Sequence, residues 1–410
     1  MSLRTSPAGR IWNLISQNGI REGFRKASNI WARHQLAAPH DVLSEYGFVL
    51  DEDSPARLKA PRKGPLRINW IVPAFGRGDG GMFNILRAVH QLEQWGHTNR
   101  IYMVGPPLAA SASPTEVARN YFPIRTKVEP FGKEIADSDA LIATLWTTAY
   151  AVRNVGNTAR KFYMIQDVEP LFYASGSLNE FSRETYRWGF YGITAGEWIA
   201  DVLHREFNME CMAFRFSYDR QVYSPHGSQL LPKGRRRVLF YARPATERRG
   251  FELGILALSL VARKMPDIEF VLAGLRPRSI ELPFRFNIPG VLSPNELGSL
   301  YRSCDAALVL SHTNLSLLPL ELMASGCAVV SNSGPNVEWL LTEEIARLAP
   351  PAPQPLADAI LALLQDDALR TRQVEAALAF AQSTNWLSEI RSIESALYHG
   401  LGIFNGATHE

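Results

Sequence analysis

The chain has 410 residues, of which 46% are apolar and 20% are charged, and its net charge is +3. This length predicts two or three domains with sizeable cores, and the near-balanced charge argues against a nucleic-acid partner. We find neither an apolar run of membrane-spanning length nor a signal-peptide block. Cys211, Cys304 and Cys327 lie far apart without metal spacing, so we expect a cytoplasmic protein with no zinc site.

The first 40 residues combine six basic side chains with one acid, and tryptophans, isoleucines and leucines lie between them. A basic amphipathic helix of this kind can lie on an anionic membrane surface. A helical arm packed on its own protein explains the pattern equally simply and is the interpretation we favour, because Gly19 interrupts the periodicity. A peripheral membrane contact through residues 1–40, at the inner face of the membrane, stays open, as does a homodimer.

Apolar runs typical of buried strands then alternate with stretches of helical period. In the first half, strands are expected over residues 66–75, 100–105, 139–146, 161–167 and 191–196, with a helix over residues 81–96. A Pro- and Gly-containing break between Tyr218 and Arg237 precedes a second series, with strands over 237–244, 268–274, 306–311 and 328–333, helices over 251–266, 295–305 and 317–326, and a helical tail.

This alternation predicts an α/β protein with two Rossmann-like, doubly wound domains that face a cleft. The expected organisation is a helical arm (1–60), a first Rossmann-like domain (61–220), a second Rossmann-like domain (221–385) and a C-terminal helix (386–410) that can cross back to the first domain. Ligands of open parallel sheets bind outside the carboxyl ends of the strands, so strand ends are where a site is expected.

A glycine-rich loop with Gly76, Gly78, Gly80 and Gly81 follows the first predicted strand and matches G-x-G-x-x-G. A dinucleotide site would also need an acid at the end of the next strand, and the sequence there is "VGPP", which disfavours NAD. The glycines still allow a ligand close to the backbone at a helix start. A tight turn without a ligand is the alternative.

Three arginines, Arg243, Arg248 and Arg249, follow the first strand of the second half. Guanidinium groups at a strand end can hold a diphosphate through forked hydrogen bonds, although a solvated loop paired with Glu247 and Glu252 would look the same. No Asp-x-Asp pair follows a strand, so we expect these cations, rather than a metal ion, to stabilise a leaving diphosphate.

The stretch "SHTNLSLLPLELMASGC" places a carboxylate, Glu321, within an otherwise apolar run. Thr313, Asn314 and Ser316 are residues that often cap helices, so a helix with phosphate-binding amides is expected to start there. Glu321 would then lie about one turn into that helix and could accept two ribose hydroxyls. Pairing of Glu321 with an internal arginine is the alternative, because an unpaired buried charge is costly.

These motifs resemble the donor domain of retaining glycosyltransferases of the GT-B fold, the family that includes sucrose and glycogen synthases. The family pattern falls on Arg243, on Arg249 with Gly250, and on Glu321 ahead of "LMASGCAVV". The stretches "QDVEPLFYASG", "TYRWGFYGITAG" and "FYARPATERRGFELG" are more narrowly similar to bacterial rhamnosyltransferases that use dTDP-L-rhamnose to build surface polysaccharides. One departure is Thr313, which stands where the family has an acid.

The resemblance implies retaining, metal-independent transfer of L-rhamnose from dTDP-L-rhamnose to a glycan or lipid-linked glycan acceptor, with no cofactor. It also implies that the first domain (61–220) binds the acceptor and the second (221–385) binds the nucleotide-sugar donor. The catalytic candidates are Arg243, Arg249 and Asp167, where Asp167 would orient the acceptor hydroxyl or simply cap or pair a neighbour. The donor-binding candidates are Arg248, Thr313, Asn314, Ser316, Glu321, Gly274 and Val291. The acceptor-side candidates are Gly78, Gly80, Gly81, Gln166, Glu169 and Tyr173. Tyr186 and Trp188 could stack on sugar rings or pack in the core.

Two other functions stay open. A nucleotide-sugar epimerase or a phosphorylase would use the same fold, and the former would release nucleotide without a glycan acceptor. A non-catalytic nucleotide-sugar-binding subunit of an assembly complex is the alternative from another class, and the neutral Thr313 keeps it open.

Overall fold

A computed structural model of the chain describes residues 41–61, 63–76, 79–106, 113–132, 134–232, 234–275, 281–290 and 292–403. The basic segment 1–40, and with it the choice between a packed helical arm and a membrane contact, lies outside these residues. The described residues fall into two units, which are divided between Glu52 and Asp53. In the first unit the structure describes helix α3 (Val42–Tyr46), which Asp41 caps through the amide of Ser44, and the 3-10 helix η2 (Gly47–Leu50).

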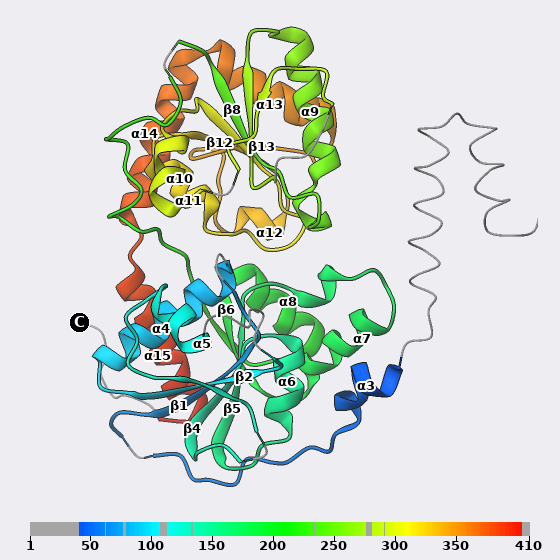
Figure 1. Ribbon diagram of the computed structural model, residues 1–410, viewed down its shortest axis with the longest axis vertical. Coiled ribbons are helices and arrows are strands. Elements are labelled where there is room, and N and C mark those ends of the chain that lie inside the picture. Colours follow the sequence, from blue (N-terminus) through cyan, green and yellow to red (C-terminus); the bar gives the residue numbers. More distant parts are fainter. Residues whose placement is uncertain are drawn as a thin grey trace, which may run out of the picture. The chain divides into compact units, whose positions relative to one another are not determined.

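The second unit contains two separate sheets, and every strand pairing in them is parallel (Figure 1). The first has the order β3-β2-β1-β4-β5-β6-β7 and the second the order β10-β9-β8-β11-β12-β13. The prediction of two Rossmann-like domains is therefore confirmed.

The strands of the first domain are short and almost continuously apolar, because helices cover both faces of a parallel sheet. Five successive residues of β1, from Ile68 to Val72, are buried. The strands are β1 (Arg67–Pro73), β2 (Thr98–Val104), β3 (Val128–Pro130), β4 (Ser138–Ala143), β5 (Thr158–Ile165), β6 (Tyr191–Ala195) and β7 (Cys211–Phe214). The helices are α4 (Gly80–Gln94), α5 (Pro114–Arg119), α6 (Trp146–Arg153), η3 (Glu169–Phe172), α7 (Ser177–Glu184), η4 (Thr185–Arg187) and α8 (Glu197–Phe207).

The second domain repeats this plan around its own core. Its strands are β8 (Arg237–Tyr241), β9 (Glu269–Ala273), β10 (Phe286–Asn287), β11 (Ala306–Val309), β12 (Ala328–Asn332) and β13 (Arg347–Ala349). Its helices are η5 (Glu247–Arg249), α9 (Phe251–Lys264), α10 (Pro294–Tyr301), α11 (Leu318–Ala324), α12 (Pro335–Glu338), α13 (Pro353–Gln365) and α14 (Asp367–Ser383). In the second sheet β8 lies between β9 and β11. The chain runs from β8 to one edge of the sheet through β9 and β10 and then to the other edge through β11, so the carboxyl end of β8 is a topological switch point.

The chain crosses between the domains twice, and the two crossings are joined by hydrogen bonds. Helix α14 packs on α11 and β12, whereas the last helix, α15 (Trp386–Gly400), packs on α4 and on β5 to β7, as Figure 1 shows for the red segment. Arg220, in the linker between the sheets, donates to the carbonyl oxygens of Gln382 and Thr384 at 2.6 and 2.7 Å. These hydrogen bonds join the linker to the C-terminal end of α14 and the segment before α15.

Within the described part of the chain, no helix combines the length and the apolar character needed to span a bilayer.

Candidate nucleotide-sugar site

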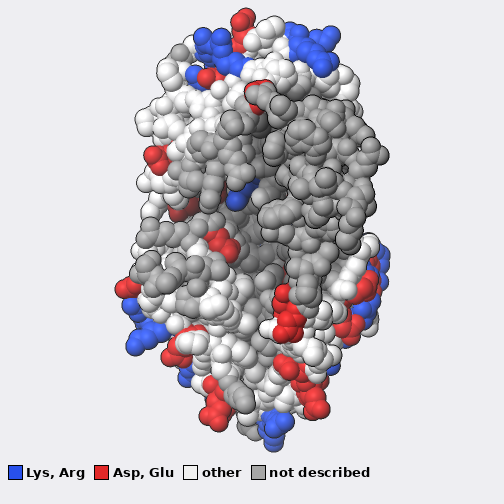
Figure 2. All heavy atoms as spheres, turned by 45° about the vertical axis from the view of Figure 1, so that its right-hand side comes forward, with Lys and Arg blue, Asp and Glu red and all other residues white. Residues whose placement is uncertain are grey.

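A cavity of about 910 Å³ lies between the two domains, at the carboxyl ends of their strands. Residues 171–174 and 176–178 of the first domain form one wall, and residues 245–248 and 312–313 of the second form the other. The space-filling view shows a recess near the middle of the face drawn, with both basic and acidic atoms close to it (Figure 2). The position is the one that a doubly wound sheet offers to ligands.

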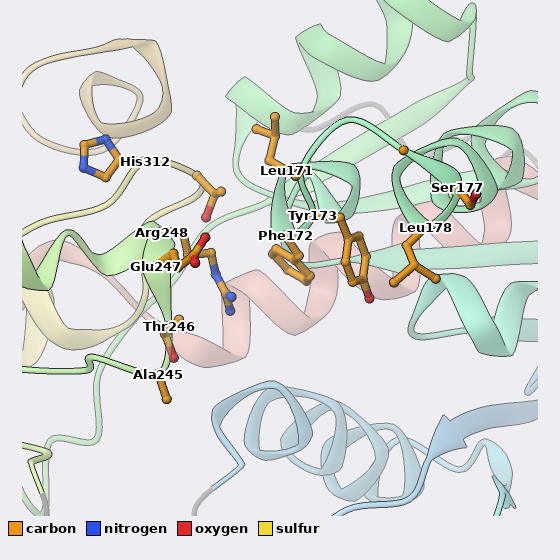
Figure 3. A pocket seen from close by; sticks show the side chains of 13 residues that line it. Leu171, Phe172, Tyr173, Ser177, Leu178, Ala245, Thr246, Glu247, Arg248 and His312 are labelled. Atoms are coloured by element: carbon orange, nitrogen blue, oxygen red, sulfur yellow. The ribbon is translucent and has the colours of Figure 1, made fainter. Parts of the chain in front are cut away.

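Arg248 reaches across this cavity to the first domain. Its guanidinium lies over the ring of Phe172, 4.1 Å from the ring centroid, and its Nε is 3.7 Å from Oδ2 of Asp167. Figure 3 shows Arg248 and Phe172 coming from opposite walls, with His312 farther along the second-domain wall. Asp167 was expected either to orient an acceptor hydroxyl or to pair with a neighbouring group, and the structure contains a pairing. Its ion-pair partner is Arg248, for which pairing with Glu247 or Glu252 was the alternative.

The turn that contains Thr313 and Asn314 donates hydrogen bonds to the carboxylate of Asp167. The hydroxyl of Thr313 donates to Oδ2 of Asp167 and the amide of Asn314 donates to Oδ1, both at 2.8 Å. The side-chain amide of Asn314 donates to the carbonyl oxygens of Gln166 and Ala195 in the first domain. Burial raises the pKa of Asp167, while these donors and the arginines lower it.

The helix predicted over residues 317–326 is observed as α11, but the prediction that Thr313, Asn314 or Ser316 caps its start is wrong. Helix α11 begins at Leu318, and its first turn has no side-chain cap. Thr313 and Asn314 lie too far before Leu318 to cap α11, and their donor groups point across the domain boundary instead. Ser316 only accepts a long hydrogen bond, 3.4 Å, from the amide of Leu318.

Arg249 is fixed behind the Thr313–Asn314 turn. It donates to the hydroxyl of Ser311 at 2.7 Å and to the carbonyl oxygen of Asn314 at 3.1 Å. Burial lowers the pKa of the Arg249 guanidinium, and the charges of Arg248 and Arg243 act in the same direction, whereas Asp167 opposes them. The three arginines therefore share one electrostatic environment.

Arg243 is exposed at the end of β8 and lies against Tyr241. Its Nε donates to the Tyr241 hydroxyl at 3.0 Å, and its guanidinium stacks over that ring. Gly274 packs against the Tyr241 ring. A Cβ at position 274 would lie 3.1 Å from this ring, and the φ of Gly274, +83°, also favours glycine. A larger residue at 274 would push Tyr241 and, with it, Arg243.

Among the described residues, the partners of Glu321 are two tyrosines and not an arginine. The hydroxyl of Tyr301 lies 3.5 Å from Oε2, and Tyr223, from the linker, also donates to the carboxylate. Burial raises the pKa of Glu321 to about 7, and both phenols lower it. Glu321 and Arg243 are thus each held by tyrosine hydroxyls, Glu321 by Tyr223 and Tyr301 and Arg243 by Tyr241.

On the first-domain side, Gln166, which follows β5, makes side-chain hydrogen bonds to the start of α4 after the glycine-rich loop. Its Nε2 donates to the carbonyl oxygen of Gly81 at 3.1 Å, and its Oε1 accepts from Asn84 at 2.8 Å. The helix start is capped by Asp79, which accepts from the amides of Gly81 and Met82. Gly80 has open space where a Cβ would be. Gly78, like Val291 of the second domain, is outside the described residues.

The other acceptor-side candidates differ in position. Tyr173 lines the cavity, and its hydroxyl accepts from Nε1 of Trp146. Glu169 points inward: it is 3% exposed and accepts from the amide of Trp146 and the hydroxyl of Tyr163. Burial raises its pKa to about 8. Tyr186 and Trp188 belong to the hydrophobic core of this domain.

Sequence reasoning missed the residues that hold these groups in place. They are Phe172 under Arg248, Ser311 beside Arg249, Tyr223 and Tyr301 around Glu321, Tyr241 beside Arg243, and Asn336, which donates to the carbonyl oxygens of Ser311 and Thr313. Only Phe172 stood next to a named candidate. The described residues contain no group of three His, Cys, Asp or Glu side chains placed to hold a metal ion.

Two Rossmann-like domains with a site between their strand ends define the GT-B fold of glycosyltransferases. Among solved structures, the chain is similar to sucrose-phosphate synthase from Thermosynechococcus elongatus, with a TM-score of 0.65 at 15% identity, covering 82% of this chain and 99% of that one. It is also similar to Anabaena Alr3699/HepE in complex with UDP and glucose, with a TM-score of 0.62 at 14% identity over 81% of this chain and 100% of that one. At these identities the likeness concerns the fold alone.

In sequence, residues 236–361 match the family described as the WsaF C-terminal domain. The chain is 31% identical over 375 residues to the O-antigen biosynthesis protein RfbC of Myxococcus xanthus, covering 87% of this chain but 29% of that protein. It is 28% identical over 169 residues to a phosphatidyl-myo-inositol mannosyltransferase of Mycobacterium tuberculosis, covering 38% of this chain and 45% of that protein. The chain thus spans less than half the length of these relatives.

Proposed function

We propose that the protein is a glycosyltransferase of bacterial surface-polysaccharide synthesis that transfers a hexose from a nucleotide sugar to a glycan acceptor. The observation that carries this proposal is that Arg248 and Thr313 line a cavity between two Rossmann-like domains, with the Asn314 amide and Arg249 directly behind them. Fixed cations and amides are what a departing diphosphate requires. The similarity to an O-antigen biosynthesis protein supports the polysaccharide context.

The donor we propose is dTDP-L-rhamnose, used with retention and without a metal ion. Support for rhamnose comes from the resemblance of the motifs and from Thr313, since a neutral hydroxyl suits a 6-deoxy sugar with few polar groups. Arg243 and Arg249 would stabilise the leaving diphosphate and Glu321 would accept the ribose hydroxyls. Gln166, Tyr173 and the glycine loop would face the acceptor, with Asp167 orienting its hydroxyl.

A donor screen tests this function. The purified protein is incubated with dTDP-, UDP- and GDP-sugars, with and without a rhamnose-terminated acceptor, and both nucleotide release and glycan extension are scored. Transfer from dTDP-rhamnose that depends on the acceptor is expected. Release of nucleotide without acceptor would point to an epimerase instead.

The second candidate function is a non-catalytic nucleotide-sugar-binding subunit. It is favoured by one observation: Asp167, the candidate for activating an acceptor, is fully engaged by Thr313 and Asn314. Nucleotide-sugar binding in calorimetry without release or extension for any donor would select this candidate.

A further inference from the structure

The carboxylate of Asp167 belongs to the first domain but has its strongest partners in the second. Oδ1 accepts from the amide of Asn314 at 2.8 Å and from its neighbour Val168 at 2.9 Å. Oδ2 accepts from the hydroxyl of Thr313 at 2.8 Å and lies 3.7 Å from Nε of Arg248. Asp167 is only 9% exposed, so water supplies little of its solvation.

These second-domain donors form an anion site in their own right. A backbone amide, a hydroxyl and a guanidinium that point to one place suit a phosphate oxygen as well as a carboxylate oxygen. Nε of Arg248 has no hydrogen bond to any described residue, so this guanidinium keeps a donor for a larger anion. Arg249 adds positive charge directly behind the turn.

We propose that Asp167 is a built-in competitor for this anion site: its carboxylate fills the site in the empty protein, and a diphosphate must displace it. The inference rests on the proposed function in that the diphosphate is the donor's or the product's. Two anions cannot share one set of donors at this distance without a large repulsion. Binding of the diphosphate therefore frees Asp167, and only then can this carboxylate turn to an acceptor hydroxyl.

The same exchange couples ligand binding to the contact between the domains. While Asp167 fills the site, the Thr313–Asn314 turn is held to the first domain by Asp167 and by the carbonyl oxygens of Gln166 and Ala195. A diphosphate would replace the first of these links. A diphosphate must break the hydrogen bonds of Asp167 to Thr313 and Asn314 before it binds. The free energy needed to break them weakens the observed affinity for every diphosphate ligand.

Calorimetric titration with inorganic pyrophosphate tests the competition without any sugar transfer. Asp167→Asn should bind pyrophosphate about 10- to 100-fold more tightly than the unaltered protein, as expected for removing one or two charge-assisted hydrogen bonds. Asp139→Asn is the matched control. Asp139 is a buried carboxylate of the same domain that pairs with the amide and guanidinium of Arg67, at the opposite end of the strands. Its replacement changes the net charge equally and should leave the affinity unchanged.

Equal or weaker pyrophosphate binding by Asp167→Asn would overturn the proposal, as would the absence of binding to all three proteins. A tightening of the same size in Asp139→Asn would also overturn it, because the effect would then be one of net charge. If Asp167→Asn does not fold, Asp167→Ser takes its place with the same expectation, and thermal melting verifies both. A donor screen without transfer would refute the proposed enzyme but not this competition, since pyrophosphate reports on the anion site alone.

Discussion

The two sets of strand ends that meet at the cavity have opposite chemistry. The first domain contributes acids and amides, with Asp167 and Gln166 after β5, whereas the second contributes three arginines and the Thr313–Asn314 turn. The same Rossmann-like plan thus carries a cationic site in one domain and an anionic partner in the other. The comparison teaches that the fold fixes where a ligand lies, and that the loop residues fix its charge.

The largest expected effect comes from removing the cationic side. Arg243→Ala combined with Arg249→Ala should lower kcat/KM for transfer by about 1,000-fold or more, because each cation stabilises charge that grows on the diphosphate. Steady-state kinetics measure this, with circular dichroism to verify folding. Arg263→Ala, an exposed arginine in the last turn of α9, is the control and should keep full activity. Retained activity in the double variant would refute the assignment of these arginines.

Glu321 gives the second largest effect and a pH signature. Its pKa is raised to about 7, so the carboxylate that would accept ribose hydroxyls forms only as the pH rises through this value. The donor KM should therefore fall between pH 6 and 8, and Glu321→Gln should raise it about 10- to 100-fold at pH 8 and remove the pH dependence. Glu375→Gln, exposed on α14, should behave as the unaltered protein. A pH profile that persists in Glu321→Gln would assign the titration to another group.

A substitution of Gln166 tests whether the first domain acts on the acceptor and not on the donor. Gln166→Ala removes the hydrogen bonds to Gly81 and Asn84 that shape the first-domain side. The acceptor KM should rise about 5- to 10-fold while the donor KM stays constant, because a neutral hydrogen bond contributes about 1 kcal/mol. Gln94→Ala, at the far end of α4, is the control. A change confined to the donor KM would show that the glycine loop belongs to the donor side.

The smallest effect is expected from Tyr301. Tyr301→Phe removes a phenol that lowers the pKa of Glu321, so this pKa should move above its value of about 7. The donor KM at neutral pH should rise about 2- to 5-fold, with the midpoint of its pH profile displaced upward. Tyr150→Phe, whose hydroxyl donates to the carbonyl oxygen of Phe181, is the matched control. An unchanged midpoint would mean that Tyr223 and burial alone set the pKa.

Local patterns in the sequence were sufficient for the architecture. Strands such as β1 and β8 are continuous apolar runs, and α4 and α9 carry helical periodicity, so their alternation predicted two parallel sheets. The error was the N-terminus of α11, which Thr313, Asn314 or Ser316 was expected to cap. Its expected capping residues satisfy a local rule, but their hydrogen bonds go to Asp167 and Gln166, about 150 positions away in the chain.

What the sequence by itself determined is therefore the two-domain plan and the strand ends where chemistry gathers, because periodicity and strand-end residues are encoded locally. Only the tertiary structure decided the partners: Asp167 with Thr313, Asn314 and Arg248, and Glu321 with Tyr223 and Tyr301. These pairings join residues that are far apart along the chain. Each is needed because a charged group buried without a hydrogen-bond or ion-pair partner would destabilise the folded protein.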